Sequence, residues 1–321
     1  MKKLLNLVIL TFLLTSAYGQ QDPQYSFNMF NHLAVNPGFA GANGGICAKG
    51  IYHNQWMGFE NSPTTMVFSG DMAMQSINSG VGLNVIQDNN GFNNNLYLNG
   101  NYAYRLKIGS DGDLGIGVGI GLLQNKISGE WTTPDMLSNP NGSANDDPLV
   151  PKQESHMNFD ANVGLFYHTT FDKYNEMYAG LSMTHLTQPT FITDAGGEGN
   201  YFPRSLYFAA GYYYTLPNGL IQLRPSVFVK SEFSTAQVDV NLIAMYNQMF
   251  WGGLSYRVSG SDIAIMAGAT LKNNLTFGVS YDITALGNEL GSVGSLGVML
   301  KYCFSLSGSK GRTSYKSVRF L

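Results

Sequence analysis

The chain has 321 residues, of which 44% are hydrophobic, 13% aromatic and only 12% charged. This charged share is about half that of an ordinary soluble domain, so a fully water-exposed surface of this composition would aggregate. After residue 20 the sequence holds no uncharged apolar stretch of the roughly 18 residues that a membrane-spanning helix needs. The net charge of −3, without a Lys/Arg stripe, argues against nucleic acid as a partner. Little charge and many aromatic residues indicate a transmembrane β-barrel.

Residues 1–19 have the pattern of a secretory signal peptide. Lys2 and Lys3 form a positive start, an apolar run extends from Leu4 to Leu14, and Gly19 closes a small-x-small cleavage site. We expect the mature chain to begin at Gln20, with 16 basic against 21 acidic residues, a net charge of −5. An uncleaved anchor is the alternative, but the apolar run is too short to span a bilayer. The sequence therefore predicts export to the outer membrane of a Gram-negative bacterium.

Apolar residues alternate with polar or tiny ones along most of the remaining chain. Between Leu114 and Leu122, apolar residues at even positions alternate with four glycines at odd positions. The same period of two recurs in 96–107, 157–168, 221–230 and 238–247. One apolar and one polar face per strand is the signature of a barrel that faces lipid outside and a polar lumen inside. The glycine face of 115–121 further suggests close approach of backbone or of a plug inside the lumen.

The alternating segments predict about fourteen antiparallel strands between residues 45 and 304. They are 46–54, 64–73, 79–87, 95–107, 113–125, 155–168, 176–186, 204–215, 220–231, 235–247, 249–258, 261–271, 274–283 and 292–304. An even number places both ends of the barrel in the periplasm. Connections after even-numbered strands are mostly short, whereas the longest ones, about 127–154 and 187–203, follow odd-numbered strands. We therefore expect short periplasmic turns and longer outer loops.

Aromatic residues give a second test of the barrel. Outward positions at the ends of even-numbered strands carry Tyr102, Tyr104, Tyr212, Tyr214, Tyr246, Tyr302 and Phe304. Aromatic residues at one rim are typical of an interfacial girdle. A soluble β-sandwich or lipocalin-like barrel also explains the alternation, but its polar face would carry more Lys and Glu than this sequence has.

The segment 20–44 precedes the first strand and has no sustained period, so we assign it to the periplasm or to the lumen. Its residues 22–41, DPQYSFNMFNHLAVNPGFAG, closely resemble the N-terminal signature of the PorP/SprF family. The residues that carry the motif are Asp22, Pro23, Gln24, Tyr25, Asn36, Pro37 and Gly41. A shorter match follows at residues 54–64, NQWMGFENSPT.

The resemblance implies an outer-membrane protein of the type IX secretion and gliding systems. Its expected partners are outer-membrane lipids, the translocon and the periplasmic lipoprotein ring, and it can also anchor secreted adhesins through their C-terminal domains. A passive or substrate-selective channel for small solutes is the alternative, because a polar inner face suits both classes.

The second match carries the candidate partner-binding residues, Gln55, Trp56, Gly58, Phe59 and Pro63. Trp56 can serve as an interfacial anchor of the first outer loop. With its aromatic and proline neighbours it can equally form a docking surface for another protein, because Trp is frequent among binding hot spots. The sequence leaves both interpretations open.

Catalytic and metal-binding patterns are weak, so we predict no enzyme activity and no cofactor. The five histidines form no HExxH motif, no GxSxG elbow occurs, and the two cysteines form no CxxC pair. Asp160 and His168 share the inward face of one strand, where we expect them to be hydrogen-bonded lumen residues. A hydrolase would need acid and base groups that converge at one rim.

Cys47 and Cys303 lie near the start of the first predicted strand and the end of the last. These strands pair in a closed barrel, so the two residues should be close at the periplasmic rim. Either a disulfide or two free buried thiols would fit this position. The tail 305–321 holds four basic residues and no acidic one, and we expect a disordered end or a periplasmic contact.

Overall fold

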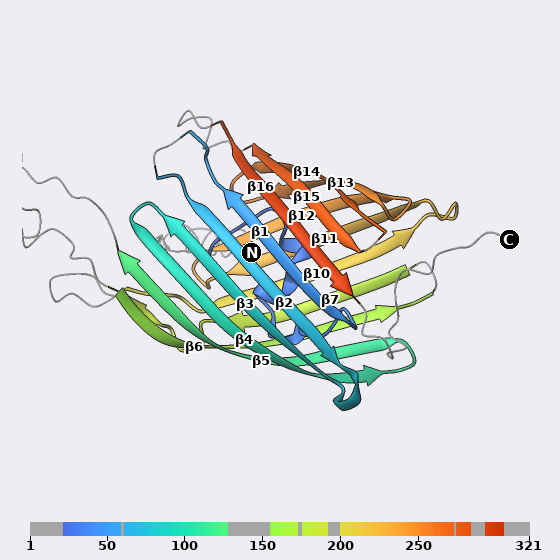
Figure 1. Cartoon of the computed structure of the whole chain (residues 1–321), viewed down its shortest axis with the longest axis horizontal. Coiled ribbons are helices and arrows are strands. Elements are labelled where there is room, and N and C mark those ends of the chain that lie inside the picture. Colours follow the sequence, from blue (N-terminus) through green and yellow to red (C-terminus); the bar gives the residue numbers. More distant parts are fainter. Residues whose placement is uncertain are drawn as a thin grey trace, which may run out of the picture.

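A computed structural model describes residues 22–58, 61–127, 155–172, 175–191, 200–272, 274–283 and 293–304. In these residues fourteen antiparallel strands close into a barrel (Figure 1). The barrel strands are β1 (Ile46–Asn54), β2 (Thr64–Met74), β3 (Ser79–Asn90), β4 (Asn93–Ile108), β5 (Gly112–Ile127), β6 (Ser155–Thr170), β7 (Asn175–Thr184), β10 (Ser205–Thr215), β11 (Ile221–Ser231), β12 (Ala236–Tyr246), β13 (Phe250–Arg257), β14 (Asp262–Thr270), β15 (Leu275–Ile283) and β16 (Ser295–Phe304). The predicted fold class and all fourteen predicted strands are confirmed.

The barrel closes where the first strand pairs with the last. The register runs from Ile46 opposite Phe304 to Asn54 opposite Leu296 without a bulge. The pairing continues beyond the strands, because the Met57 N–H donates to the Gly294 carbonyl and the Val293 N–H donates to the Met57 carbonyl. The seam is therefore hydrogen-bonded along its whole described length.

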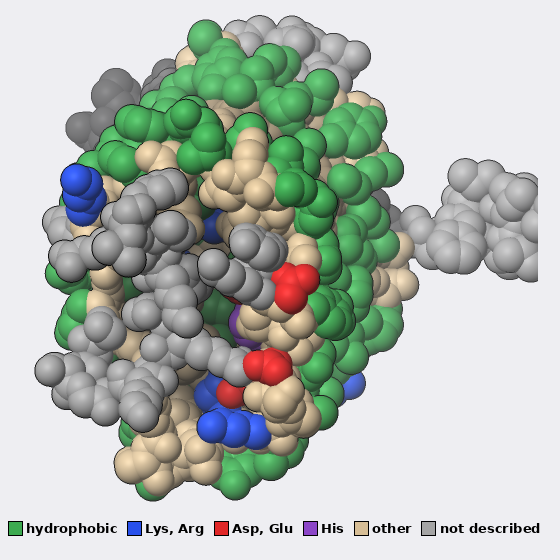
Figure 2. Space-filling model, turned by 90° about the vertical axis from the view of Figure 1, so that its right-hand side faces the viewer, with side chains coloured by type: hydrophobic (Ala, Val, Ile, Leu, Met, Phe, Trp, Pro, Cys, Tyr) green, Lys and Arg blue, Asp and Glu red, His purple; other side chains and the backbone are tan. Residues whose placement is uncertain are grey.

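Residues that alternate between apolar and polar in the sequence point alternately to the outside of the barrel and to the lumen. On β12, Val240 and Leu242 are 50% and 48% exposed, whereas Asp239 and Asn241 are 1% and 2% exposed. Figure 2 looks at the barrel from the end where β16 finishes, and shows hydrophobic side chains along the wall and most visible charged ones around the opening. A soluble sandwich would bury the apolar face, so that alternative is wrong.

The two ends of the barrel differ as predicted. The long connections 128–154 and 185–204 lie at the outer end, where β5 and β7 finish. At the periplasmic end, β4 joins β5 through 109–111 and β12 joins β13 through 247–249. All seven residues of the predicted aromatic girdle are exposed. Six of them lie within the last five residues of their strands, at this end, whereas Tyr102 lies deeper, opposite Val118. The predicted signal peptide, most of the predicted loop 127–154 and the tail 305–321 lie outside the described residues.

One element of the outer loops was not predicted. The connection between β7 and β10 contains a two-stranded sheet, β8 (Thr190–Phe191) and β9 (Asn200–Tyr201). Two-residue strands are too short to give a readable period of two. Among the described residues, no helix is long and apolar enough to cross a membrane.

Residues 22–45 run through the inside of the barrel, and we call them the plug. They form three single-turn 3₁₀ helices, η1 (Asn28–Phe30), η2 (His32–Ala34) and η3 (Pro37–Phe39); a fourth, η4 (Gln75–Ile77), joins β2 to β3. Asn36 caps η3, since its side chain accepts a hydrogen bond from the Gly38 N–H, and Pro37 is suited to the first helical position. The plug thus crosses the lumen as three short turns, of which only η3 has a side-chain cap.

Candidate functional site

The outermost described residue of the plug, Asp22, is held by side chains near the outer ends of β7, β10 and β11. One carboxylate oxygen accepts from His185 Nε2 at 2.9 Å, and the other accepts from the Tyr207 hydroxyl. Lys230 Nζ donates to the main-chain oxygen of Asp22 at 3.1 Å and pairs with Glu232 at 2.8 Å. These contacts fix the plug at the outer mouth.

His185 stands between two carboxylates, with Asp160 Oδ2 2.8 Å from its Nδ1 on the side away from Asp22. Burial alone would lower the pKa of His185, but Asp22 and Asp160 raise it to about 10. Burial would likewise raise the pKa of Asp22, but His185 and Lys230 hold it well below its usual range. The imidazole is therefore positively charged at neutral pH and donates from both nitrogens.

Further along, the plug combines polar contacts with an apolar core. The Ser26 hydroxyl donates to Asp282, which also lies 3.3 Å from His53 Nε2, and the Asn28 amide donates to Asp239 at 2.9 Å. Phe27 is 1% exposed. It packs in a cluster with inward side chains of the wall, among them Ile51, Val67, Ile243, Met245, Trp251, Met266 and Met299. Several inward positions are therefore apolar because they face the plug rather than water.

The middle of the plug lies against the glycine face of β5 and β6. A Cβ added to Gly117 would come within 2.2 Å of the Gly38 nitrogen, and one added to Gly115 within 2.1 Å of the Gly38 oxygen. The Asn36 amide donates to the Leu165 carbonyl at 2.9 Å. The close approach suggested by the spacing of these glycines is present: the plug is the partner of Gly115 and Gly117, whereas Gly119 and Gly121 face Asn side chains of the neighbouring strands.

We expect Gly117→Ala to dislodge the plug. The added methyl group meets backbone atoms that cannot rotate away, so the cost should lie at the upper end of the roughly 1–3 kcal/mol typical of overpacking. Urea unfolding in detergent, followed by tryptophan fluorescence, measures it. Gly100→Ala is the matched control, because its nearest new neighbour lies 3.8 Å away. Equal stability of the two variants would contradict the close contact.

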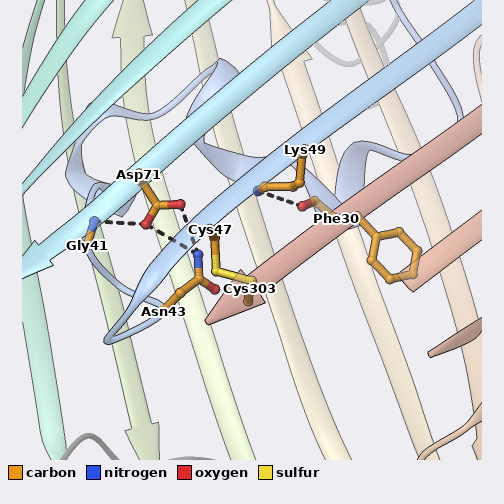
Figure 3. Close-up of a disulfide and its surroundings, with 7 residues drawn as sticks. All are labelled: Phe30, Gly41, Asn43, Cys47, Lys49, Asp71 and Cys303. Carbon is orange, nitrogen blue, oxygen red and sulfur yellow. Dashed lines mark hydrogen bonds between the residues drawn. A yellow bond between two sulfur atoms is a disulfide. The ribbon is translucent and has the colours of Figure 1, made fainter. Parts of the chain in front are cut away.

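The inner end of the plug is anchored beside the seam (Figure 3). Asp71 accepts from the Gly41 N–H and the Asn43 amide, both at 3.1 Å. Lys49 Nζ donates to the Phe30 carbonyl at 2.9 Å. Cys47 and Cys303 are opposite each other in the register and form a disulfide, with their Cα atoms 4.1 Å apart. The predicted closeness of the two cysteines is confirmed. The sequence left open a disulfide or two free thiols, and the structure has the disulfide.

All seven motif residues lie on this plug. Asp22 and Gly41 bind the wall at opposite ends of the lumen. Tyr25 is buried and its hydroxyl accepts from Asn31 at 3.3 Å. Gln24 lines a recess beside Lys230. Pro23 lines that recess too, while Asn36 and Pro37 form the cap and first residue of η3.

The first outer connection is tied to the last one. The main-chain N–H of Trp56 donates to Ser295 Oγ at 3.0 Å, and the main-chain N–H of Gln55 donates to the Pro63 carbonyl at 2.8 Å. Trp56 is half-buried, and its indole N–H has no hydrogen-bond partner among the described residues. Gly58 is exposed and has a positive φ of 104°. Phe59 lies outside the described residues, so the structure places four of these five candidates on one connection.

The two inward residues of β6 that the sequence singled out, Asp160 and His168, bind separate partners. His168 Nε2 lies 3.3 Å from Glu176, and Asp160 serves His185. Within the described ranges, no group of three or more His, Cys, Asp or Glu side chains could hold a metal ion. The sequence analysis did not anticipate the Asp22, His185 and Asp160 cluster, because its members come from three separated segments and no local period links them.

A closed, plugged antiparallel barrel with an apolar outer wall is an outer-membrane β-barrel protein. The solved structures that share this fold include three that form hydrocarbon transporters or channels. The toluene transporter TbuX of Ralstonia pickettii has 10% identity and a TM-score of 0.50, covering 85% of this chain and 92% of its own. The CymD monoaromatic hydrocarbon channel has 9% identity and a TM-score of 0.52, covering 86% and 92%. The toluene transporter TodX of Pseudomonas putida has 8% identity and a TM-score of 0.50, covering 91% and 95%.

At such low identity these likenesses show the fold alone. Residues 17–302 match the family described as type IX secretion system membrane protein PorP/SprF. The chain belongs to this family, as the N-terminal motif indicated, and is thus an outer-membrane component of type IX secretion. A comparison with curated protein sequences gave no match.

Proposed function

We propose that the protein is a non-enzymatic docking component of the type IX secretion machinery and does not conduct its clients. In this proposal it partners the translocon and the periplasmic lipoprotein ring, and it anchors secreted surface proteins. Family membership supports the secretion system as the setting. The partners themselves follow from the family resemblance and remain part of the proposal.

The observation that carries this proposal is the plug. It contacts the wall from His185 and Lys230 at the outer end to Asp71 at the inner end. A polypeptide could pass only if the whole plug left the lumen, which would break its buried hydrogen bonds and expose its apolar cluster. A barrel filled in this way is better suited to present surfaces than to conduct.

We further propose that the first outer connection is one of these surfaces, with Gln55, Trp56, Gly58, Phe59 and Pro63 as its contact residues. A half-buried tryptophan at the mouth of the barrel offers apolar area to a partner. Trp56→Ala should then reduce co-purification of secretion components. Tyr246→Ala, at the opposite rim, is the control.

The alternative function is a selective channel for small solutes. The shared fold with solved hydrocarbon channels favours it, as does a recess of about 470 Å³, its opening included, beside the outer end of the plug. A small solute would need only part of the plug to move.

Single-channel recording separates the two functions. If the plug seals the lumen, the purified protein should be silent in planar bilayers, whereas a general porin reconstituted in parallel conducts. The same preparation from cells should co-purify with secretion components. Large, stable conductance without such partners would overturn the docking proposal in favour of the channel.

A further inference from the structure

The cradle around Asp22 has the geometry of a receptor for a carboxylate. Each of the two carboxylate oxygens meets one donor, His185 Nε2 at 2.9 Å and the Tyr207 hydroxyl. The amine of Lys230 lies against the same residue, 3.1 Å from its main-chain oxygen. One donor for each oxygen, with a second cation nearby, matches a planar anion and not a neutral amide.

The wall holds this cradle in shape without help from Asp22. Asp160 binds the far nitrogen of His185 at 2.8 Å, and Asp160 in turn accepts from the Ala161 N–H and from Thr187. Glu232 holds Lys230 at 2.8 Å. The imidazole therefore keeps its orientation if Asp22 leaves.

Space for the rest of a ligand lies beside the cradle. The recess beside the outer end of the plug is bordered by Asp22, His185 and Tyr207, and also by Tyr97 and Thr184. The hydroxyls of Tyr97 and Thr184 are buried without a hydrogen-bond partner in the described part of the chain. Unpaired buried hydroxyls are costly, so they indicate a place where a polar group can bind.

The two ends of the plug are held with unequal strength. The inner end continues directly into β1, whose Cys47 is covalently bonded to β16. The outer end is held by the noncovalent contacts of Asp22, and the Asp22 side chain keeps 15% of its surface exposed. Release of the plug should therefore begin at Asp22.

We infer that the cradle of His185, Tyr207 and Lys230 is a carboxylate-binding site, occupied at rest by the chain's own Asp22. A ligand with a free carboxylate, arriving at the outer mouth, competes with Asp22 and loosens the outer end of the plug. This inference rests on the cradle geometry and not on the type IX partners, so either can fail without the other.

Asp22→Ala empties the cradle and allows a direct test with acetate as the probe. The purified variant, folded in detergent, should have a lower thermal midpoint than the original protein. Sodium acetate should restore most of the lost midpoint, whereas sodium chloride at equal ionic strength and neutral acetamide should not. If Asp22→Ala refolds poorly, the refolding yield is the readout, and acetate should restore it.

Three matched proteins control this test. The unchanged protein and Asp22→Asn should respond to acetate less than Asp22→Ala, because in both a side chain tethered to the plug occupies the cradle and acetate must displace it. Asp22→Ala/His185→Gln should lose the acetate response, because the charged donor is gone. Equal effects of acetate and chloride on Asp22→Ala, or an acetate response that survives His185→Gln, would overturn the inference.

Discussion

Removing the Cys47–Cys303 disulfide should lower the free energy of unfolding by about 5 kcal/mol in the chain-entropy model. The bond joins residues 256 positions apart, so it turns almost the whole unfolded chain into a ring and strongly restricts its conformations. It also joins the first barrel strand to the last, at the periplasmic end of the seam. We expect this loss to be the largest produced by any single bond in the barrel.

Urea titration of the detergent-folded protein, with and without reductant, measures the effect. Cys47→Ser, Cys303→Ser and the double variant should all be destabilised equally, because each removes the same bond. Unfolded, unreduced protein should migrate faster in a denaturing gel than reduced protein. Stability that is unchanged by reductant, or losses that add in the double variant, would contradict this prediction.

An arginine on the lipid-facing wall should have the next largest effect. Val118 lies in the middle of β5 and is 50% exposed to what the fold identifies as the bilayer. Val118→Arg should cost roughly 2–4 kcal/mol, because a charged side chain near the bilayer midplane loses its hydration. Val163 and Leu242, also outward and exposed, should behave in the same way.

Depth provides the control for this experiment. Ile108 is also outward and exposed, but it is the last residue of β4, at the periplasmic rim. Ile108→Arg should cost only about 0–1 kcal/mol, since its charge reaches the interface. Folding into lipid vesicles, measured as the urea midpoint for both variants, tests the difference. Equal costs at the two positions would mean that Val118 does not face lipid.

The plug also changes the expected cost in stability of an arginine on the inner face of the barrel. In an open lumen, Arg at Gly119, Asn162 or Asn241 would stay hydrated and would cost little stability. Here the Asn162 side chain accepts from the main-chain N–H of His185, and the Asn241 amide donates to the Asn28 side chain of the plug at 3.3 Å. Inward positions therefore tolerate large side chains only where no plug residue packs against them.

The sequence by itself determined the barrel. A strand's side chains alternate between two faces, so a local period of two reports both the presence of each strand and its facing, as at 114–122 and 238–246. Closure of the barrel pairs the first strand with the last, and an even number of strands makes this pair antiparallel. Together these two facts placed Cys47 near Cys303. Whether they were bonded depended on the facing of β1, which its short run of mixed residues did not reveal.

Only the tertiary structure decided what fills the lumen. The plug has no period, because its single turns are shaped by the Asn36 cap of η3 and by the wall around them. Inward Ile243 and Trp251 are apolar because Phe27 packs beside them, a fact that no local window contains. The Asp22–His185 pair spans 163 positions. The geometry of this pair depends on both barrel closure and insertion of the plug. In the period-two pattern, only the glycines that face Gly38 indicated the insertion of the plug.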